Sequence, residues 1–540
     1  MNEMIKANEW KKFVIAAILF CLVFIWLELM PLFSATSSHE YGGKTIEKEA
    51  AEQTAIQFVE KQTGYTVSDA KTIHQANKLF IGYLSKEKLT ESYDKQFDRL
   101  FPNDYFQVNF KLADTKGSGL VNIHMFSGQI VGWEFYVGST QQTVNEQLQK
   151  EAISAELAKY QFSQDQINSL KLLPKGEWSS PAPVFKIGEA SMNIKAMAQQ
   201  IGDKIVVTKY SSQFTPPPDY KNYVAKQDSL AGLLTGFGYL GMSIVLFILA
   251  IIYAVLYRHY TSFKYGSILT FIFLIVYIVM NVNMLDAVMA SQGAGIPTNG
   301  IKIFTLVITL VLSLAMAASV YISIVAGDGL WKAQGRNLWP RLGQAGYGQY
   351  VWRSMGLSYL FAIIMLGLQP IIFLLLEKVI GTWSTTDVSM SPYNMSALWL
   401  MPVLAWAAAI SEEAVFRFFG IGIFRRWFKN SFLAALLPTL FWALGHVTYP
   451  FYPATTRLFE LMIIGLLFSF IFVRYGFITA MFTHAIFNTV AVSSSLFMTG
   501  TADNIVSAVF FLVLPVIIAY VLKIWDRKKA AAAPIPNNYT

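Results

Sequence analysis

Ten apolar runs, each close to the length needed to cross a lipid bilayer, constrain this chain more than any other feature of its sequence. The hydrocarbon core of a bilayer is ~30 Å thick, and a helix needs about 20 mostly apolar residues to cross it. Because backbone groups in hydrocarbon must be hydrogen-bonded within their own segment, we predict that the runs are helices. We place them at residues 13–33, 230–257, 266–286, 301–326, 354–377, 395–422, 431–449, 458–473, 477–497 and 504–525.

The composition agrees with this interpretation. Hydrophobic residues make up 54% of the 540 residues and charged residues only 14%, which is typical of a membrane protein rather than of a large soluble enzyme. The predicted fold class is therefore an all-α polytopic membrane helical bundle of about ten transmembrane helices. The single cysteine, Cys21, excludes an intrachain disulfide.

Residues 34–229 differ from everything that follows, with mixed charge, many turn residues and a proline run at Pro216–Pro218. Helical periodicity at Ile46–Gln62, and again at Val144–Tyr160, is followed each time by alternating apolar and polar residues, a pattern typical of strands. We predict an extracytoplasmic α+β domain inserted between helices 1 and 2. The recurring order of a helix and then strands suggests two repeats.

A turn predicted at Ser127 and Gly128 joins two of these strands, and Gly132 follows it. The helix-then-strands unit with these glycines resembles a PepSY-type module, which implies a binding or regulatory domain whose ligand the sequence leaves unknown. Its histidines are scattered among polar residues, so we predict no catalytic site in this segment.

The basic residues predict how the chain is oriented. Counted alternately from a cytoplasmic N-terminus, the inside segments hold most of the lysine and arginine, as the positive-inside rule requires. We therefore predict a multi-pass protein of the cell membrane with both termini cytoplasmic. This placement also accounts for the net charge of +8, and we expect no nucleic-acid partner. The inside residues are Arg258, Lys264, Lys332, Arg336, Arg341, Arg353, Arg425, Arg426, Lys429, Arg474, Arg527, Lys528 and Lys529, against Lys302, Lys378 and Arg457 outside.

Three charged residues lie inside the run at 395–422, namely Glu412, Glu413 and Arg417. A charge at such a depth costs at least ~2.5–3.5 kcal/mol on insertion scales, so the cluster is a hypothesis of function. Residues four apart share a helix face, which predicts an ion pair between Glu413 and Arg417. Glu412 then points to a neighbouring face and is available for another role.

Two further apolar runs carry polar groups that match this cluster. His446 lies in LFWALGHV, and His484 and Asn488 lie four residues apart in MFTHAIFNT. We predict that both histidines lie within membrane helices. At ~1.5 Å rise per residue, both histidines and Glu412 can meet within a ~30 Å core.

The motifs EEAVFR, WALGH and HAIFN together resemble the CAAX-protease and bacteriocin-processing family, also called the Abi or type II CAAX prenyl endopeptidase family. Order and spacing agree over roughly Ala397 to Leu496. One position departs from the family pattern, because Trp442 stands where phenylalanine is usual, with Phe441 beside it.

The resemblance implies an intramembrane endopeptidase that opens toward the cytoplasmic side and cleaves a membrane-embedded or membrane-tethered peptide or protein in the bilayer. It implies that Glu412 activates a water molecule and that His446 orients this water or protonates the leaving amine. His484 and Asn488 would stabilise the oxyanion, while Glu413 and Arg417 would fix the helix and tune Glu412. A carboxylate and hydrogen-bond donors in a low-dielectric cavity are suited to these roles.

A metal site is the competing mechanism. Glu412, His446 and His484 could supply three ligands to a catalytic zinc ion and leave one position for water. The H-E-x-x-H signature is absent, however, and the two histidines are on separate helices. We therefore expect a reaction without a required cofactor, with zinc as the alternative.

Two other classes of function stay open at this point. Buried carboxylates also serve as relays in ion-coupled transporters, although the inverted repeat common in such folds is not evident here. A non-cleaving membrane scaffold or sensor with a ligand-binding extracytoplasmic domain is the other alternative. We divide the chain into a tail and first anchor (1–33), the extracytoplasmic region (34–229), helices 2–5 (230–393), the catalytic membrane core (394–498), and the last helix with its tail (499–540).

Overall fold

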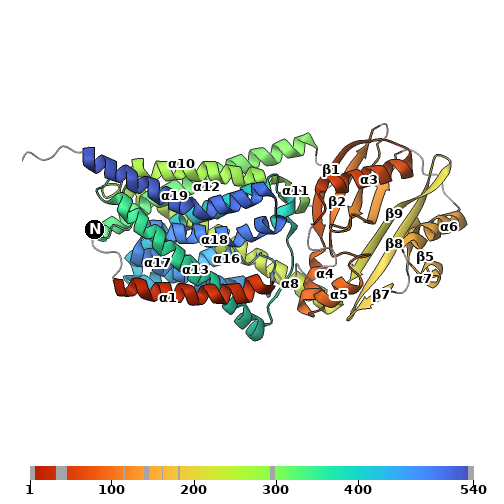
Figure 1. Ribbon diagram of the computed structural model, residues 1–540, viewed down its shortest axis with the longest axis horizontal. Coiled ribbons are helices and arrows are strands. Elements are labelled where there is room, and N and C mark those ends of the chain that lie inside the picture. Colours follow the sequence, from red (N-terminus) through yellow and green to blue (C-terminus); the bar gives the residue numbers. More distant parts are fainter. Residues whose placement is uncertain are drawn as a thin grey trace, which may run out of the picture.

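The computed structural model consists of a helical bundle and a sheet-containing domain that lie end to end (Figure 1). It describes residues 7–31, 45–113, 116–138, 145–160, 162–180, 183–291 and 298–532. The predicted boundary between the first anchor and the polar segment, at residues 33 and 34, lies outside the described residues. So does Val144, the predicted start of the second helix of the polar segment.

The bundle is that of a polytopic helical membrane protein. Among the described residues, nine helices are long and apolar enough to cross a membrane. Several of these helices are longer than the predicted spans, since the helix continues into the polar residues that flank the apolar run. Their bounds are α1 Ala7–Phe24 with its extension Ile25–Leu29; α8 Pro218–Leu233, continuing through Leu234–Gly241 into α9 Met242–Leu256; α10 Phe263–Asn283; α12 Asn299–Ala333; α13 Tyr347–Ile380; α14 Val403–Glu412, continuing through Glu413–Ile421 into α15 Gly422–Phe428; α17 Thr456–Tyr475; α18 Phe477–Thr499; and α19 Ala502–Ala532.

The predicted span at 431–449 corresponds to a shorter helix, α16 Ser431–Leu444. Its 14 residues rise only ~21 Å, which is less than the ~30 Å hydrocarbon core. The next residues form turns up to Pro450, since proline and the residue before it disfavour helix. The prediction that His446 lies within a membrane helix is therefore wrong, because His446 occupies the turn that follows α16.

The sheet domain contains one antiparallel sheet of nine strands, in the order β1-β2-β3-β4-β9-β8-β6-β5, with β7 paired to β8. The predicted hairpin is confirmed, and Gly128 adopts the positive φ of 70° that its turn requires. The domain also has helices, of which α4, α5 and α7 were not predicted. The elements are α3 Lys48–Thr63, β1 Val67–Ala76, α4 Lys78–Lys86, α5 Thr90–Gln96, β2 Asp104–Leu112, β3 Ser118–Ile123, β4 Ile130–Tyr136, α6 Glu146–Leu157, α7 Gln164–Asn168, β5 Lys171–Leu172, β6 Trp178–Ser179, β7 Phe185–Ile187, β8 Ala190–Ile201 and β9 Lys204–Thr215.

The order of a helix and then strands occurs twice, with α3 before β1–β4 and α6 before β5–β9. The two sets are joined edge to edge, because Trp133 and Glu134 of β4 pair with Tyr210 and Lys209 of β9. One hydrophobic cluster extends across both sets. The polar segment is thus one continuous sheet domain.

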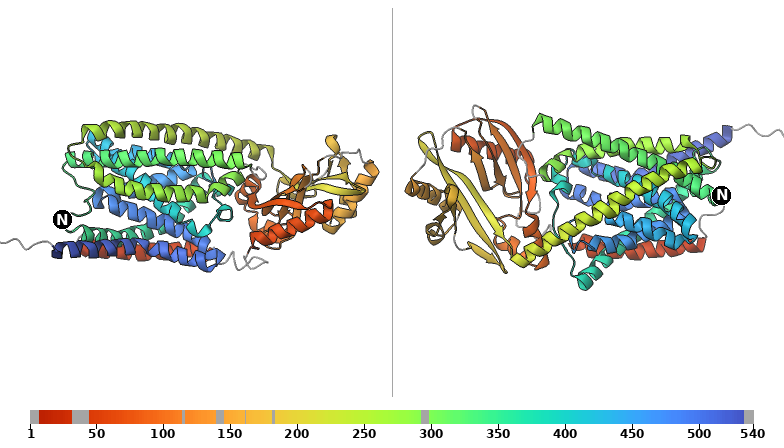
Figure 2. Two further views of the ribbon diagram at one scale, coloured as in Figure 1. Left: turned by 90° about the horizontal axis from the view of Figure 1, so that it is seen from above. Right: turned by 180° about the vertical axis from the view of Figure 1, so that it is seen from behind.

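The sheet domain is attached to one end of the bundle, and both ends of the described chain lie at the other end (Figures 1 and 2). Lys71 of edge strand β1 forms an ion pair with Asp286 in α11 Leu285–Ser291. Asn394 extends the same edge, since its side-chain amide accepts from His74 N at 2.7 Å and donates to His74 O at 2.9 Å. These bonds satisfy an edge strand that would otherwise be open.

Candidate active site

The charged cluster begins where α14 passes into a π-helical stretch, Glu413–Ile421. Such widened turns are rare and are often found at functional sites. Glu413 is fully buried and Arg417 is 1% exposed, and Arg417 Nη1 lies 3.2 Å from Glu413 Oε1. The predicted ion pair is therefore confirmed. A buried pair of this kind is costly to break, because the remaining charge would have no partner.

Arg417 lies between two aromatic side chains that come from other helices. Its guanidinium carbon is 4.1 Å from the ring centre of Trp442 on α16 and 5.4 Å from that of Phe468 on α17. Among the described residues, its nitrogens make no hydrogen bond that complements the ion pair. The ring faces therefore supply most of the remaining stabilisation through cation–π contact.

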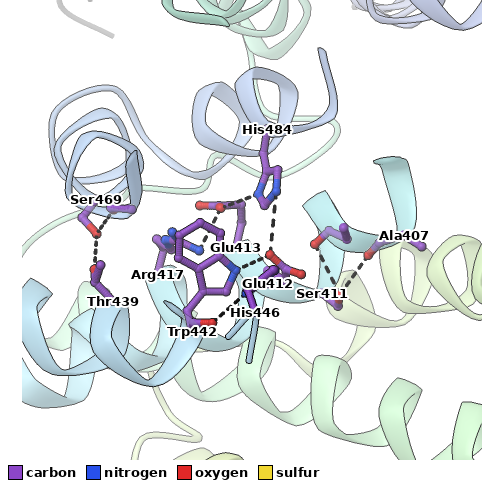
Figure 3. Close-up of polar contacts among 12 residues, drawn as sticks. Ala407, Ser411, Glu412, Glu413, Arg417, Thr439, Trp442, His446, Ser469 and His484 are labelled. Atoms are coloured by element: carbon purple, nitrogen blue, oxygen red, sulfur yellow. Dashed lines mark hydrogen bonds and ion pairs between the residues drawn. The ribbon is translucent and has the colours of Figure 1, made fainter. Parts of the chain in front are cut away.

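Glu412 is the more open of the two glutamates, with its side chain 19% exposed. The indole Nε1 of Trp442 donates a hydrogen bond to Glu412 Oε2 (Figure 3). His484 Nε2 lies 3.7 Å from the same oxygen, which is too far for a direct hydrogen bond. One carboxylate oxygen thus faces both an indole donor and an imidazole.

His484 lies on α18 and is held by contacts with residues of two other helices. Its Nδ1 lies 2.9 Å from Glu413 Oε1, so the ring bridges the two adjacent glutamates. The imidazole stacks on Phe468, with ring centres 4.6 Å apart and planes at 25°. The side chain is 3% exposed. This contact between Glu413 and His484 was not predicted, since a helix-face argument cannot pair residues on different helices.

His446 is held differently, because it belongs to a loop. Its Nδ1 lies 2.9 Å from the carbonyl oxygen of Trp442 in the last turn of α16. Its ring centre is 5.2 Å from that of Trp442 and 5.2 Å from that of Tyr449. It is half-buried and lies beside Glu412 in the close-up (Figure 3).

Asn488 lies one turn beyond His484 on α18 and is partly exposed. Among the described residues it makes no hydrogen bond to the other predicted site residues. The structure therefore brings together Glu412, Glu413, Arg417 and His484, with His446 at their edge, and leaves Asn488 apart.

Two residues of this cluster had no predicted role. Trp442 was recognised only as an aromatic motif position, although an indole at that position also carries a hydrogen-bond donor. In the helix predicted for this run, a donor four residues before His446 would share its face, which was a usable signal. Phe468, which contacts both Arg417 and His484, gave no signal, because it is one phenylalanine among many in an apolar helix.

The acid Glu460 on α17 has a structural role. It is fully buried, accepts a hydrogen bond from Gln369 Nε2 at 3.0 Å and lies 3.0 Å from Arg457 Nη1. Its contact with Gln369 joins α17 to α13. Glu460 is therefore an interhelical polar contact outside the candidate site.

The arrangement does not form the three-ligand set predicted for zinc. Within the described parts of the chain, no group of three or more His, Cys, Asp or Glu side chains is placed to hold a metal ion. His484 directs Nδ1 to Glu413, and His446 directs Nδ1 to a backbone carbonyl. Both Nε2 atoms stay open, but within the described parts of the chain no third side chain completes a set of metal ligands with them.

The fold and this cluster define a polytopic helical membrane protein with a carboxylate–histidine site inside its bundle. Residues 394–490 match the family model described as Type II CAAX prenyl endopeptidase Rce1-like. The resemblance predicted from the three motifs is thus confirmed over this segment, which contains all six predicted site residues. The matched segment is roughly a fifth of the chain and does not include the sheet domain. No curated protein and no solved structure matches the chain.

Proposed function

We propose that this protein is an intramembrane endopeptidase that hydrolyses a peptide bond in a membrane-associated or lipid-modified peptide or protein. The observation that carries the proposal is the contrast within the cluster. The Glu412 side chain is partly exposed to solvent and lies near an imidazole, whereas the side chains of Glu413, Arg417 and His484 are buried. The Rce1-like match over the same residues supports a peptidase of the CAAX type.

In the proposed reaction, Glu412 takes a proton from a water molecule as the water oxygen attacks the carbonyl carbon of the scissile bond. A C–O bond forms, and the carbonyl electron pair moves to the oxygen. His484 in its imidazolium form, with one N–H on Glu413 and the other at Nε2, and the Asn488 amide donate to this oxyanion, an arrangement that is most effective where water is scarce. When the carbonyl re-forms, the C–N bond breaks and the leaving amine takes a proton from Glu412 or His446.

Glu413 and Arg417 act in this scheme by holding His484. Because Glu413 accepts from Nδ1, Nε2 remains directed toward Glu412. Arg417 in turn compensates the buried charge of Glu413. Asn488 reaches the oxyanion only if substrate binding brings it closer, since it lies apart from the cluster in the substrate-free chain.

The scheme requires no cofactor. Zinc held by Glu412, His446 and His484 is the alternative, and it would need these three side chains to move together around one position, because no group of three among the described residues is placed to hold a metal ion. We further propose that the protein lies in the cell membrane with both termini cytoplasmic, residues 34–229 extracytoplasmic and the site open toward the cytoplasmic side. The basic residues at the end of the bundle that holds both chain ends support this orientation.

Comparative terminal proteomics of membranes tests the proposal. Cells carrying the wild type are compared with cells carrying Glu412→Gln, which keeps the shape of the side chain and removes the base. Glu377→Gln, at an exposed ion pair with Lys88, is the matched control. In wild-type cells, we expect at least one membrane-bound peptide or protein to carry a terminus created by cleavage. This terminus should be missing in Glu412→Gln cells and present in Glu377→Gln cells. If termini are unchanged and biological activity is retained, the scaffold or sensor alternative replaces the peptidase.

A further inference from the structure

One continuous helix connects the sheet domain to the candidate active site. Residues Pro218–Leu256 form a helix of 39 residues, ~58 Å long, that begins directly after β9. Tyr220 and Val224, in its first two turns, are buried in the hydrophobic cluster of the sheet domain. The helix then runs along the bundle (Figure 2).

The site loop, defined as residues 445–455, follows α16 and contains His446. The third turn of the helix Pro218–Leu256 binds the C-terminal end of this loop. Tyr452 Oη donates to Asp228 Oδ1 at 2.5 Å, and Ala454 N donates to Gln227 Oε1 at 2.9 Å. Both acceptors lie on the turn of the helix that follows Val224.

The next turns of the same helix hold the near end of the loop. Ala231 packs in a small cluster with Leu444. Thr235 Oγ1 donates to the carbonyl oxygen of Leu444 at 3.2 Å. Tyr239 packs so closely on Gly445 that a Cβ there would lie 2.7 Å from its ring. Contacts recur every three to four residues, so one face of the helix follows the site loop over its length.

A second connection reaches Tyr452 from α4 of the sheet domain. Trp383 and Tyr452 pair as two short strands, and their rings stack with centres 4.5 Å apart. Tyr220 packs on the same tryptophan, with ring centres 5.8 Å apart. Gly82 of α4 leaves no space behind it, because a Cβ there would lie 2.7 Å from the Trp383 ring and 2.7 Å from Tyr220 Oη.

His446 therefore lies between two contacts of the loop. Gly445 packs on Tyr239 of the long helix, and Tyr452 contacts Asp228 of the same helix and Trp383 beside the sheet domain. His446 immediately follows Gly445, and Tyr452 is six positions later, a distance of at most ~20 Å along the chain. The same helix also contacts the π-helical stretch that begins at Glu413, since the Tyr239 ring centre is 6.1 Å from that of Phe416.

We propose that the sheet domain sets the position of His446, with the helix Pro218–Leu256 and the stacked pair of Trp383 and Tyr452 as the mechanical connection. Asp228 and Tyr452 are positioning residues in this arrangement. A partner that shifts the sheet domain would change turnover at the site inside the bundle. The catalytic consequence rests on the proposed function, whereas the mechanical coupling does not.

The test compares two glycine-to-alanine variants of the full chain in lipid nanodiscs. Gly82→Ala adds a methyl group against Trp383 and Tyr220, whereas Gly232→Ala adds one where no atom lies within 4 Å. Both positions are in helices, so the change in helix propensity is matched. The measurements are hydrogen exchange of peptides covering 445–455 and of peptides from α18, together with kcat and KM for a substrate that the wild type cleaves.

We expect Gly82→Ala to raise exchange in the site loop about fivefold and to leave α18 unchanged. We expect kcat to fall about tenfold with KM nearly constant, because a small displacement of a catalytic group lowers the rate of the chemical step. Gly232→Ala should match the wild type in every measurement.

Tyr452→Phe is a second, milder variant, which removes the hydroxyl that binds Asp228 and keeps the stacked ring; Tyr223→Phe, at an exposed position of the same helix, is its control. It should raise loop exchange in the same direction. Unchanged loop exchange in both Gly82→Ala and Tyr452→Phe overturns the coupling. Loop exchange that rises with kcat unchanged overturns the positioning of His446. If the wild type cleaves nothing, the proposed function fails, and exchange in the loop still decides whether the coupling exists.

Discussion

The two histidines of the candidate active site are held in opposite ways. His484 is nearly inaccessible on a long helix, with Glu413 at one ring nitrogen and Phe468 against its face. His446 lies in a loop, with one backbone contact to α16 and anchors that lead to the sheet domain. The difference suggests a fixed half of the site, built by the bundle, and an adjustable half, set from outside it.

Alanine substitution of each histidine should give the largest effects and separate the two halves. We expect turnover to fall ~10²–10³-fold in both His484→Ala and His446→Ala. Only His484→Ala should also destabilise the protein, by ~2–3 kcal/mol, because it leaves a buried Glu413 oxygen without its donor. The test measures thermal unfolding in detergent and substrate cleavage for both variants. Equal loss of stability in both variants would contradict the comparison.

Arg417→Lys tests how the fixed half is assembled. Lysine keeps the charge but loses the planar group that lies between Trp442 and Phe468, so we expect a loss of ~3 kcal/mol in unfolding free energy. Arg426→Lys, at an exposed arginine on Tyr257, is the control and should change stability by less than ~0.5 kcal/mol. Similar melting curves for the two variants would show that the aromatic contacts contribute little.

Trp442→Phe tests the residue whose ring lies near both histidines, with ring centres 5.2 Å from His446 and 6.1 Å from His484. The change restores the aromatic usual at this motif position and removes the indole donor to Glu412. A hydrogen bond to a charged group contributes ~1.5–3 kcal/mol, so we expect kcat to fall about tenfold or more. Trp427→Phe, at an exposed indole that donates to Tyr253, should leave kcat unchanged. Full activity of Trp442→Phe would mean that the aromatic ring alone is needed.

Metal removal should have the smallest effect. Within the described residues no group of three or more His, Cys, Asp or Glu side chains is placed to hold a metal ion, so we expect turnover to change by less than about twofold after dialysis against a chelator. Activity lost with the chelator and recovered with zinc would favour the alternative with Glu412, His446 and His484 as ligands. The melting temperature of the treated protein serves as the control for unfolding.

The sequence predicted the helical bundle well because long apolar runs have few other solutions in a membrane. It failed at α16, where the apolar run continues past the end of the helix at Leu444, whose C-cap is Gly445. The same limit applied to the polar segment. Alternation predicted β2, β3 and β4, but not that β4 would pair with β9 and join both sets of strands into one sheet.

The sequence by itself singled out the charged and imidazole side chains of the cluster, because charges and histidines inside apolar runs are costly and therefore few. It did not identify the roles of Trp442 and Phe468, and it included Asn488, which lies apart from the cluster. It also determined the ion pair of Glu413 and Arg417, which depends only on helix periodicity. The tertiary structure alone decided that Glu413 holds His484, that Trp442 donates to Glu412, and that the loop containing His446 is anchored through Tyr452 to Asp228. These contacts join residues that are far apart in the chain, and their geometry follows from how the helices pack rather than from any local spacing.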